Sequence, residues 1–398
     1  MSALPHEDAA DHPGSWIILA LAIACGATVA NLYYAQPLIG PISISFDLDL
    51  TAAGLIVTML QLGYMLGLIF LVPLGDLVEN KRLILIALSA VIACLIVAAL
   101  APRASVFIVA SLLIGMSATA TQMIVPVAAH LAPARSRGRI VGTVMSGLLF
   151  GILLARPIST MIAGPLGWRA MYWISAAVML AVLIMAALVL PRRRPQPGLN
   201  YLTLITSLWG LMIATPVVQW RAAYQGLLFG AFSVFWTAMP FLLQQPPFSL
   251  GHLGLSAFLL SGVAGAFVAP LAGHLADKGH SDAVTLGCFT LVAVSSVLTF
   301  IGGQGSLALL VAAGIVLDIG AQANVVIGQR AIYTLAPEIR SRVNAIYMAL
   351  FFLGGAIGSA LSGIALSHGG YATVSLFGLG FAAIAFLLFG LEKFRGRA

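Results

Sequence analysis

Two charged side chains stand inside long apolar stretches and are the residues best suited to chemistry. Asp318 lies in GIVLDIGAQAN, residues 314–324, and Arg156 lies in GLLFGILLARPIST, residues 147–160. A carboxylate can take up and release a proton, and a guanidinium can bind a carboxylate or tune a nearby acid. An ionised group at the centre of a membrane helix costs about 2.5–3.5 kcal/mol on insertion scales, so each residue calls for a cavity or a partner.

These two residues allow two interpretations. In the first, Arg156 and Asp318 form a buried ion pair that docks one part of the chain on another. In the second, Asp318 exchanges a proton during a conformational cycle, and Arg156 tunes that exchange or meets an anionic ligand group. Other chemistry lacks its signatures, because the sequence contains no HExxH, GxSxG or P-loop motif and no CxxC pair among its three cysteines. We expect no enzyme, no metal site and no cofactor.

The composition indicates what holds these residues. Of 398 residues, 61% are hydrophobic and 8% are charged, whereas soluble domains carry roughly a quarter charged residues. Apolar stretches of about 20 residues, long enough to cross a bilayer as helices, recur along the whole chain. The sequence therefore predicts an all-α membrane protein with twelve transmembrane helices. The predicted spans are 16–39, 51–75, 83–101, 105–131, 140–163, 168–190, 219–243, 250–275, 283–302, 307–333, 343–367 and 370–391.

The basic residues predict the orientation of these spans. Sixteen of the nineteen Lys and Arg residues fall in segments on the side of the two termini, and two, Arg103 and Arg169, fall on the other side. Because positive loops stay inside, both termini are expected in the cytoplasm. The net charge of +7 follows from this topology and does not indicate a nucleic-acid partner. The first fifteen residues lack the basic front region of a signal peptide.

Two short sequence segments recur about half the chain length further on. PLGDLVENKR (73–82) corresponds to GHLADKGH (273–280), and LAPARSR (131–137) corresponds to LAPEIRSR (335–342). Such internal symmetry predicts two pseudo-symmetric six-helix bundles, as in many secondary transporters. We expect a cytoplasmic tail (1–15), a first bundle (16–190), a linker (191–218), a second bundle (219–391) and a second tail (392–398). Within the linker, Leu199 to about Ala214 forms either a helix on the membrane surface or an extended tether.

These repeats resemble the major facilitator superfamily over essentially the whole chain. The family's loop motif G-x-L-x-D-R-x-G-R is matched in the second half by Gly273, Leu275, Asp277, Lys278 and Gly279. The first half keeps only Leu74, Asp76, Lys81 and Arg82. A carboxylate at a helix end can form ion pairs in one conformation and release them in another. The resemblance implies conformational latches at Asp76, Lys81 and Arg82 and at Gly273, Asp277 and Lys278; the alternative is that these residues only keep two turns in water.

The fifth predicted span resembles the glycine-rich antiporter motif of this family. Gly147, Gly151, Ala155 and Pro157 keep its small face, which permits close helix packing. Arg156 replaces the glycine that usually precedes the proline. The words NLYYAQPLI (31–39), GWR (167–169) and LDIGAQA (317–323) look most like the bacterial drug and sugar efflux branch. This likeness implies a location in a bacterial-type inner membrane.

The resemblance also implies that spans 1, 4, 7 and 10 line a central cavity. The candidate cavity residues are Asn31, Tyr34, Gln122, Phe229, Ser233, Trp236 and Gln322. At about 100° per residue, Gln322 shares the helix face of Asp318. Helix packing is the alternative for each.

The implied function is proton-coupled export of small amphipathic molecules, drug-like or sugar-like. Asp318 and Arg156 would couple it to protons, and one chain would suffice in the bilayer. Uptake by symport and a non-transporting receptor or scaffold remain alternatives.

Overall fold

The computed structural model describes residues 15–133, 136–192 and 200–395, and all regular structure within them is helical. Residues 1–14 of the first expected tail, 193–199 of the linker and 396–398 of the second expected tail lie outside these residues, whereas 392–395 belong to α16. The elements are α1 (Ser15–Ala30), η1 (Gln36–Leu38), α2 (Ile39–Phe46), α3 (Leu50–Phe70), η2 (Val72–Asp76), α4 (Asn80–Leu100), α5 (Ala104–Ala118), α6 (Ala120–Leu131), α7 (Arg137–Leu166), α8 (Trp168–Val189), α9 (Tyr201–Ala214), α10 (Pro216–Leu242), α11 (His252–Leu260), η3 (Ser261–Val268), α12 (Ala269–Asp277), α13 (Ser281–Gly302), α14 (Leu307–Tyr333), α15 (Pro337–His368) and α16 (Tyr371–Arg395).

Ten helical segments of the described chain are long and apolar enough to cross a membrane. They account for ten of the twelve predicted spans. The other two spans are interrupted rather than absent. The first runs as α1, stops at Ala30, and resumes through η1 and α2; the eighth runs as α11 and passes through the 3-10 segment η3 into α12. Hydropathy did not reveal these interruptions, because it measures side-chain polarity and not the backbone hydrogen-bond pattern.

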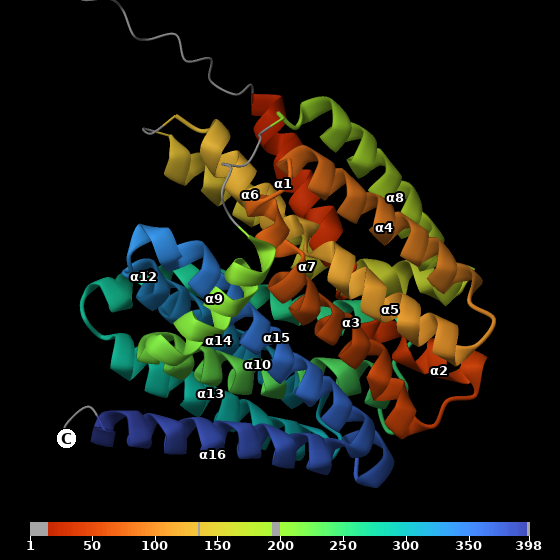
Figure 1. Ribbon diagram of the computed structural model, residues 1–398. Coiled ribbons are helices and arrows are strands. Elements are labelled where there is room, and N and C mark those ends of the chain that lie inside the picture. Colours follow the sequence, from red (N-terminus) through yellow and green to blue (C-terminus); the bar gives the residue numbers. More distant parts are fainter. Residues whose placement is uncertain (1–14, 134–135, 193–199, 396–398) are drawn as a thin grey trace, which may run out of the picture.

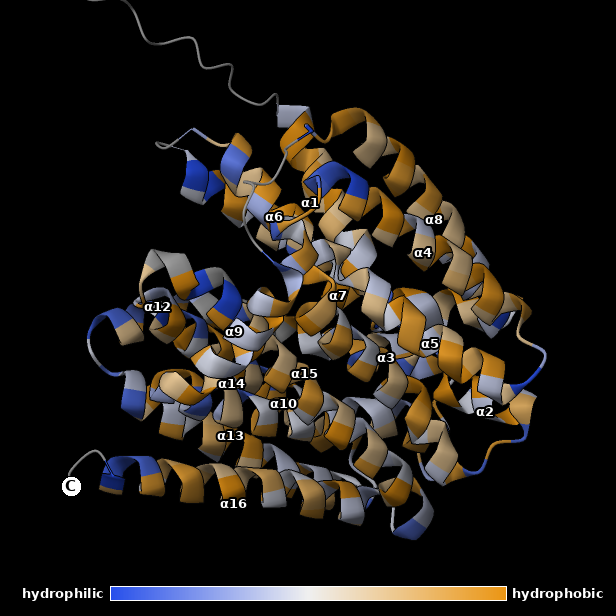
Figure 2. Ribbon diagram, viewed as in Figure 1, coloured by the Kyte–Doolittle hydropathy of each residue, from blue (hydrophilic) through white to orange (hydrophobic). Residues whose placement is uncertain are grey.

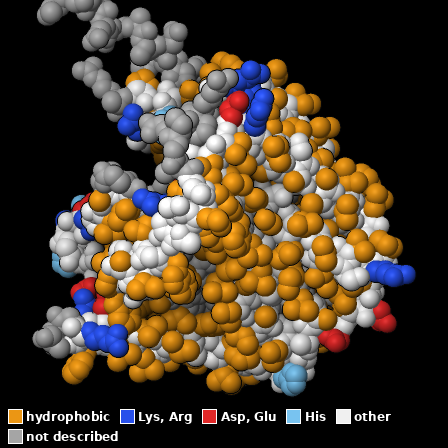
Figure 3. All heavy atoms as spheres, viewed as in Figure 1, with side chains coloured by type: hydrophobic (Ala, Val, Ile, Leu, Met, Phe, Trp, Pro, Cys, Tyr) orange, Lys and Arg blue, Asp and Glu red, His pale blue; other side chains and the backbone are white. Residues whose placement is uncertain are grey.

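The distribution of side chains fits a bilayer. Apolar residues run along the lengths of the helices, and polar residues concentrate at helix ends and loops (Figure 2). On the face shown in Figure 3, hydrophobic side chains cover a broad continuous surface, while Lys, Arg, Asp and Glu gather near its rim. Exposing such a large apolar surface to water is unfavourable, whereas contact with lipid tails is not.

The helices form two groups, joined through α9. In Figure 1, α1, α4, α5 and α8 lie in the upper right part and α6 at the upper left, whereas α12, α13, α14 and α16 lie below and to the left. The groups meet mainly where α3 packs along α15, where α7 packs against α11, and where α10 contacts η1 and α2.

Direct contacts between the groups mark one end of the molecule, which we call the closed face. There the Thr51 hydroxyl donates to the Ser367 hydroxyl at 3.3 Å. The His252 ring lies against Gly164, where an added Cβ would be 2.8 Å from it. The opposite end carries Ser15 and Arg395, and we call it the termini face.

The linker contains a helix that contacts both groups. Asn200 caps α9 by accepting the Leu202 N–H at 3.0 Å. The Tyr201 hydroxyl donates to the carbonyl of Phe70 in the first group at 2.9 Å. Leu208 is buried in a small cluster that includes Val218 and other side chains of α10, α14 and α15. The exposed face of α9 carries further apolar side chains, Leu202, Trp209 and Ile213. Tyr201–Ala214 of the predicted stretch is helical, whereas Leu199 lies outside the described residues and the location on the membrane surface stays a prediction.

Candidate functional site

Arg156 and Asp318 occupy the same level of the molecule. Arg156 lies ten residues before the end of α7, and Asp318 lies eleven residues after the start of α14. At a rise of 1.5 Å per residue, each is about 15 Å from the helix end nearest the closed face. Their exposed fractions are 3% for Arg156 and 2% for Asp318. Both charged groups are therefore buried in protein and do not face lipid.

Trp236 of α10 contacts both charged groups. Its indole N–H donates to Oδ1 of Asp318 at 2.7 Å. The guanidinium carbon of Arg156 lies 4.7 Å from the centre of the same ring system, a cation–π distance. Among the described residues, the ion pairs within 4.0 Å do not include Arg156 with Asp318. The interpretation of a direct ion pair is thus wrong for this conformation, because an indole connects the two groups.

The remaining contacts of Arg156 come from the interruption of the first span and from α10. Its Nε–H donates to Oε1 of Gln36 at 2.8 Å. The Tyr33 ring centre lies 5.3 Å from the guanidinium carbon, and the Phe232 ring centre lies 5.0 Å from it. Tyr33 and Gln36 belong to the first group of helices and Phe232 to the second. Arg156 is therefore set at the boundary between the groups.

Two glycines of η3 cover Asp318 on its other side. A Cβ built on Gly262 would lie 2.8 Å from Oδ2 of Asp318, and one on Gly265 would lie 2.7 Å from its Cβ. Side-chain atoms essentially never come so close, so the backbone of η3 can lie directly on the aspartate only because these positions are glycine. The aspartate is enclosed by α10, η3 and α14 in this conformation.

Two of the candidate cavity residues lie away from this cluster. Asn31 donates to the Ala27 and Thr28 carbonyls, and its Oδ1 accepts the Ser175 hydroxyl of α8 at 2.7 Å. Tyr34 lies in an apolar groove between α1 and α7 on the flank of the first group. The prediction of a central position is wrong for both.

The physical reason is the interruption of the first span. Residues 31–35 form a turn after α1 ends at Ala30, so the helix repeat does not set the directions of their side chains. The Tyr33 ring centre lies 5.3 Å from the guanidinium carbon of Arg156, whereas Tyr34 lies in the groove between α1 and α7.

The other candidates lie along the boundary of the groups or beside it. Gln122 donates to the Tyr64 hydroxyl at 3.1 Å. Phe229 stacks on Phe351 of α15 with ring centres 4.0 Å apart. Gln322 is partly buried, one turn along α14 from Asp318.

Ser233 belongs to a polar cluster between the groups that the sequence did not suggest. The Gln61 amide of α3 donates to the hydroxyls of Ser233 and Ser359, each at 3.2 Å. Thr237 lies 3.4 Å from the Ser359 hydroxyl. A lone glutamine in a span and scattered hydroxyls are weak signals, because only the packing of three distant helices assembles them.

The loop motifs differ between the two halves. Asp277 pairs with Arg330 at the end of α14 at 2.9 Å, and Arg330 also donates to the Ala276 carbonyl. Gly273 precedes this pair in α12, and Lys278 is exposed. In the first half, Asp76 is exposed and Lys81 partly buried, and Arg82 approaches Glu79 at 3.6 Å. Arg330, which lies outside the motif, is thus the second-half partner that the sequence reasoning missed.

The small residues of α7 lie against α1. A Cβ on Gly147 would lie 2.4 Å from the Ala22 carbonyl oxygen, and one on Gly151 would lie 2.1 Å from that of Gly26. The two backbones are therefore in direct contact. Ala155 is buried in the same helix, and the Pro157 carbonyl accepts the Ser256 hydroxyl of α11 at 3.3 Å.

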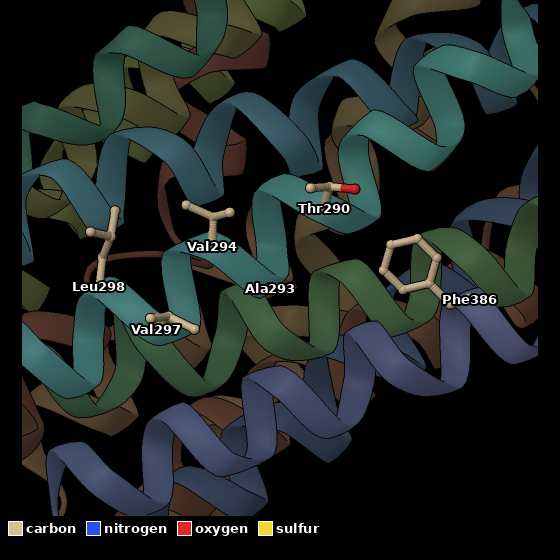
Figure 4. A pocket seen from close by; sticks show the side chains of 6 residues that line it. All are labelled: Thr290, Ala293, Val294, Val297, Leu298 and Phe386. Carbon is tan, nitrogen blue, oxygen red and sulfur yellow. The ribbon is translucent and has the colours of Figure 1, made fainter.

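Apolar grooves also mark the outer flanks of the molecule. The groove in Figure 4 lies between α13 and α16, and its side chains are almost entirely hydrocarbon. It is lined by Thr290, Ala293, Val294, Val297, Leu298 and Phe386. With no charged side chain in its lining, it fits lipid tails and offers nothing to orient a polar ligand.

Two helical groups around a buried acid, a buried cation and an aromatic row define a polytopic membrane transporter. The family model described as Major Facilitator Superfamily matches residues 18–304 and 225–397. The chain belongs to this superfamily, and the prediction of its all-α fold is confirmed.

Relatives and solved structures agree. The uncharacterized transporter YgaY of Escherichia coli O157:H7 is 39% identical over 94% of each chain. A probable sugar efflux transporter of Helicobacter pylori strain G27 is 25% identical over 90% of each. The crystal structure of a bacterial homolog of the human lysosomal transporter Spinster, inward-facing and unoccupied, superposes with a TM-score of 0.75 at 14% identity, covering 95% of this chain and 96% of that one.

Proposed function

We propose that this transporter couples the export of small amphipathic molecules to proton entry by alternating access. The observation that carries the proposal is the placement of Asp318. It is a carboxylate buried within the second group, and it receives a hydrogen bond from the same indole that faces Arg156 of the first group. Because a buried charge is stabilised by few partners here, movement of the groups changes the environment of the carboxylate and thus its proton occupancy.

The aromatic row of α10 supports a weakly selective cargo site. Phe229, Phe232 and Trp236 follow one another along α10, with successive ring centres 5.1 and 6.3 Å apart. Aromatic faces bind apolar and amphipathic molecules with little demand on their polar groups. The Helicobacter relative, named as a probable sugar efflux transporter, favours export as the direction.

The contacts between the groups support an inward-facing assignment of this conformation. They gather at the closed face, where Thr51 meets Ser367 and His252 meets Gly164. With both termini in the cytoplasm, as the distribution of basic residues favours, the closed face is the outer face. Asp277 with Arg330 and the loop of Asp76 then lie at the cytoplasmic end, where we propose that they act as latches.

The test is proton-driven transport by purified protein in proteoliposomes. Cells lacking their own exporters are first screened for resistance to drug-like dyes and sugars, which supplies the cargo. An imposed pH gradient should then drive its accumulation by the native chain. We expect Asp318→Asn to lose this accumulation while keeping cargo exchange without a gradient.

The matched control is Asp47→Asn, which changes an exposed loop carboxylate in a left-handed backbone conformation that asparagine also accepts. Accumulation by Asp318→Asn equal to that of the native chain would show that the proton site lies elsewhere. Accumulation with the proton gradient rather than against it would assign uptake instead of export.

A further inference from the structure

Arg156 carries a hydrogen-bonding capacity that its neighbours leave unused. Its Nε–H is taken by Gln36 at 2.8 Å. Its Nη2 is buried and has no hydrogen-bond partner. A guanidinium has five N–H donors in one plane and no acceptor. The aromatic rings of Tyr33, Phe232 and Trp236 cover its faces but do not take its edge donors.

Gln36 adds a second unused donor to the same place. The side chain is 1% exposed. Its Oε1 is fixed by the Arg156 bond, and its Nε2, on the same amide group, is buried with no partner. Leaving a buried donor unpaired is destabilising, and more so when the donor is charged. The two donors belong to side chains that are joined by the Nε–H to Oε1 hydrogen bond, and one of them is cationic, which matches the requirements of a small anion.

The surroundings of the two donors also favour an anion. Among the described residues, the carboxylate of this cluster is that of Asp318. It accepts the indole N–H of Trp236 and makes no ion pair with Arg156 within 4.0 Å. The rings around Arg156 are apolar, and they keep water from screening the charge. Removing a buried charge's only counter-ion is strongly destabilising, so a guanidinium in this setting gains much from any anion that reaches its edge.

We propose that Arg156 and Gln36 form an anion-binding site at the boundary of the two helical groups. The chemistry it takes is a single negative charge that accepts hydrogen bonds from Nη2 and Nε2. A free halide such as chloride and a carboxylate on an aromatic cargo share this chemistry. This proposal does not depend on the direction of transport or on the driving ion. It can therefore be tested separately from the function proposed above.

The fluorescence of Trp236 can report whether the site is occupied. Its ring is 0% exposed and lies 4.7 Å from the guanidinium carbon. Bromide quenches indole fluorescence on contact, so bromide held by Arg156 should quench Trp236 until the site is full. Exposed tryptophans such as Trp16 and Trp209 should add only a linear, collisional part. We therefore expect a saturable component on top of a linear one when purified native protein is titrated with sodium bromide at constant ionic strength.

The variants locate that component. Arg156→Gln and Trp236→Phe should lose it, whereas Arg139→Gln, an exposed arginine of the same helix, should keep it. Gln36→Glu is the second probe, because it places a carboxylate where Nε2 stands and supplies the anion from within the chain. We expect Gln36→Glu to lose the saturable quenching, bind bromide at least tenfold more weakly, and melt no lower than the native chain.

Two competition arms distinguish the sources of the anion. Displacement of bromide by chloride alone assigns a free halide. Displacement by 2-naphthoate, but not by its neutral amide, assigns a cargo carboxylate. Purely linear quenching in the native chain with no effect of either competitor, or saturable quenching that survives in a folded Gln36→Glu variant, would overturn the site.

Discussion

The hydrogen bond between Trp236 and Asp318 makes a quantitative prediction. Trp236→Phe removes the N–H donor but keeps an aromatic ring for Arg156 to lie on. The N···O distance is 2.7 Å, both residues are buried, and this is the hydrogen bond that reaches the carboxylate among the described residues. Hydrogen bonds inside membranes are worth about 1–2 kcal/mol in model peptides and average about 0.6 kcal/mol in double-mutant cycles.

A carboxylate acceptor places this bond in the upper part of that range. We expect a coupling free energy of about 1–2 kcal/mol, equivalent to roughly a factor of 5–30 in the folding equilibrium. The assay is the free energy of unfolding in mixed micelles, measured for the native chain, Trp236→Phe, Asp318→Ala, which removes the acceptor, and the double variant. The cycle cancels effects that each substitution has by itself, including the altered charge near Arg156.

The control cycle uses Trp220→Phe with Asp318→Ala. Trp220 packs on Tyr224 near the other end of α10, sixteen residues from Trp236, or about 24 Å along the helix. Its coupling to Asp318 should be close to zero. A Trp236–Asp318 coupling no larger than that of the control would refute the bond and remove the physical link between the acid and the cation.

Two further predictions concern the ends of the molecule. In a chain whose three native cysteines are replaced by alanine, Thr51→Cys with Ser367→Cys should form a disulfide under mild oxidation and stop transport until a reductant is added, because their hydroxyls lie 3.3 Å apart; failure to cross-link in the absence of cargo would contradict the closed face. Arg330→Gln should change the free energy of unfolding by less than about 1 kcal/mol, since both partners of its pair with Asp277 are solvent-exposed, yet should slow transport at least severalfold; an unchanged transport rate would leave the pair a surface contact only.

The sequence was sufficient for the ten continuous spans and for the family. Span lengths are set by the bilayer, so apolar stretches such as 168–190 and 307–333 matched α8 and α14 within a few residues. Arg156 and Asp318 were identified from the same apolar stretches, because a charged residue inside a membrane span is energetically costly and therefore rare.

What lies around those charges was not predictable to the same degree. Gln36 is a polar residue in an apolar segment, a signal that could have marked it as a candidate for a buried contact. Its partner, Arg156, lies 120 positions further along the chain and could not be predicted from the sequence. Tyr33 and Tyr34 are chemically equal, and only the interruption after Ala30 decides which one faces inward. The role of Gly262 was hidden because a glycine in a span looks the same whether it packs on lipid or on an aspartate.

The helix in the linker limits how the protein can be divided. Since Leu208 of α9 is buried among side chains of the second group, α9 belongs to that group as a folded unit, although the Tyr201 hydroxyl still contacts Phe70. A gene split into two co-expressed fragments should therefore be cut upstream of Asn200. A cut after Ala214 would leave the second fragment with an uncovered apolar patch and invite aggregation.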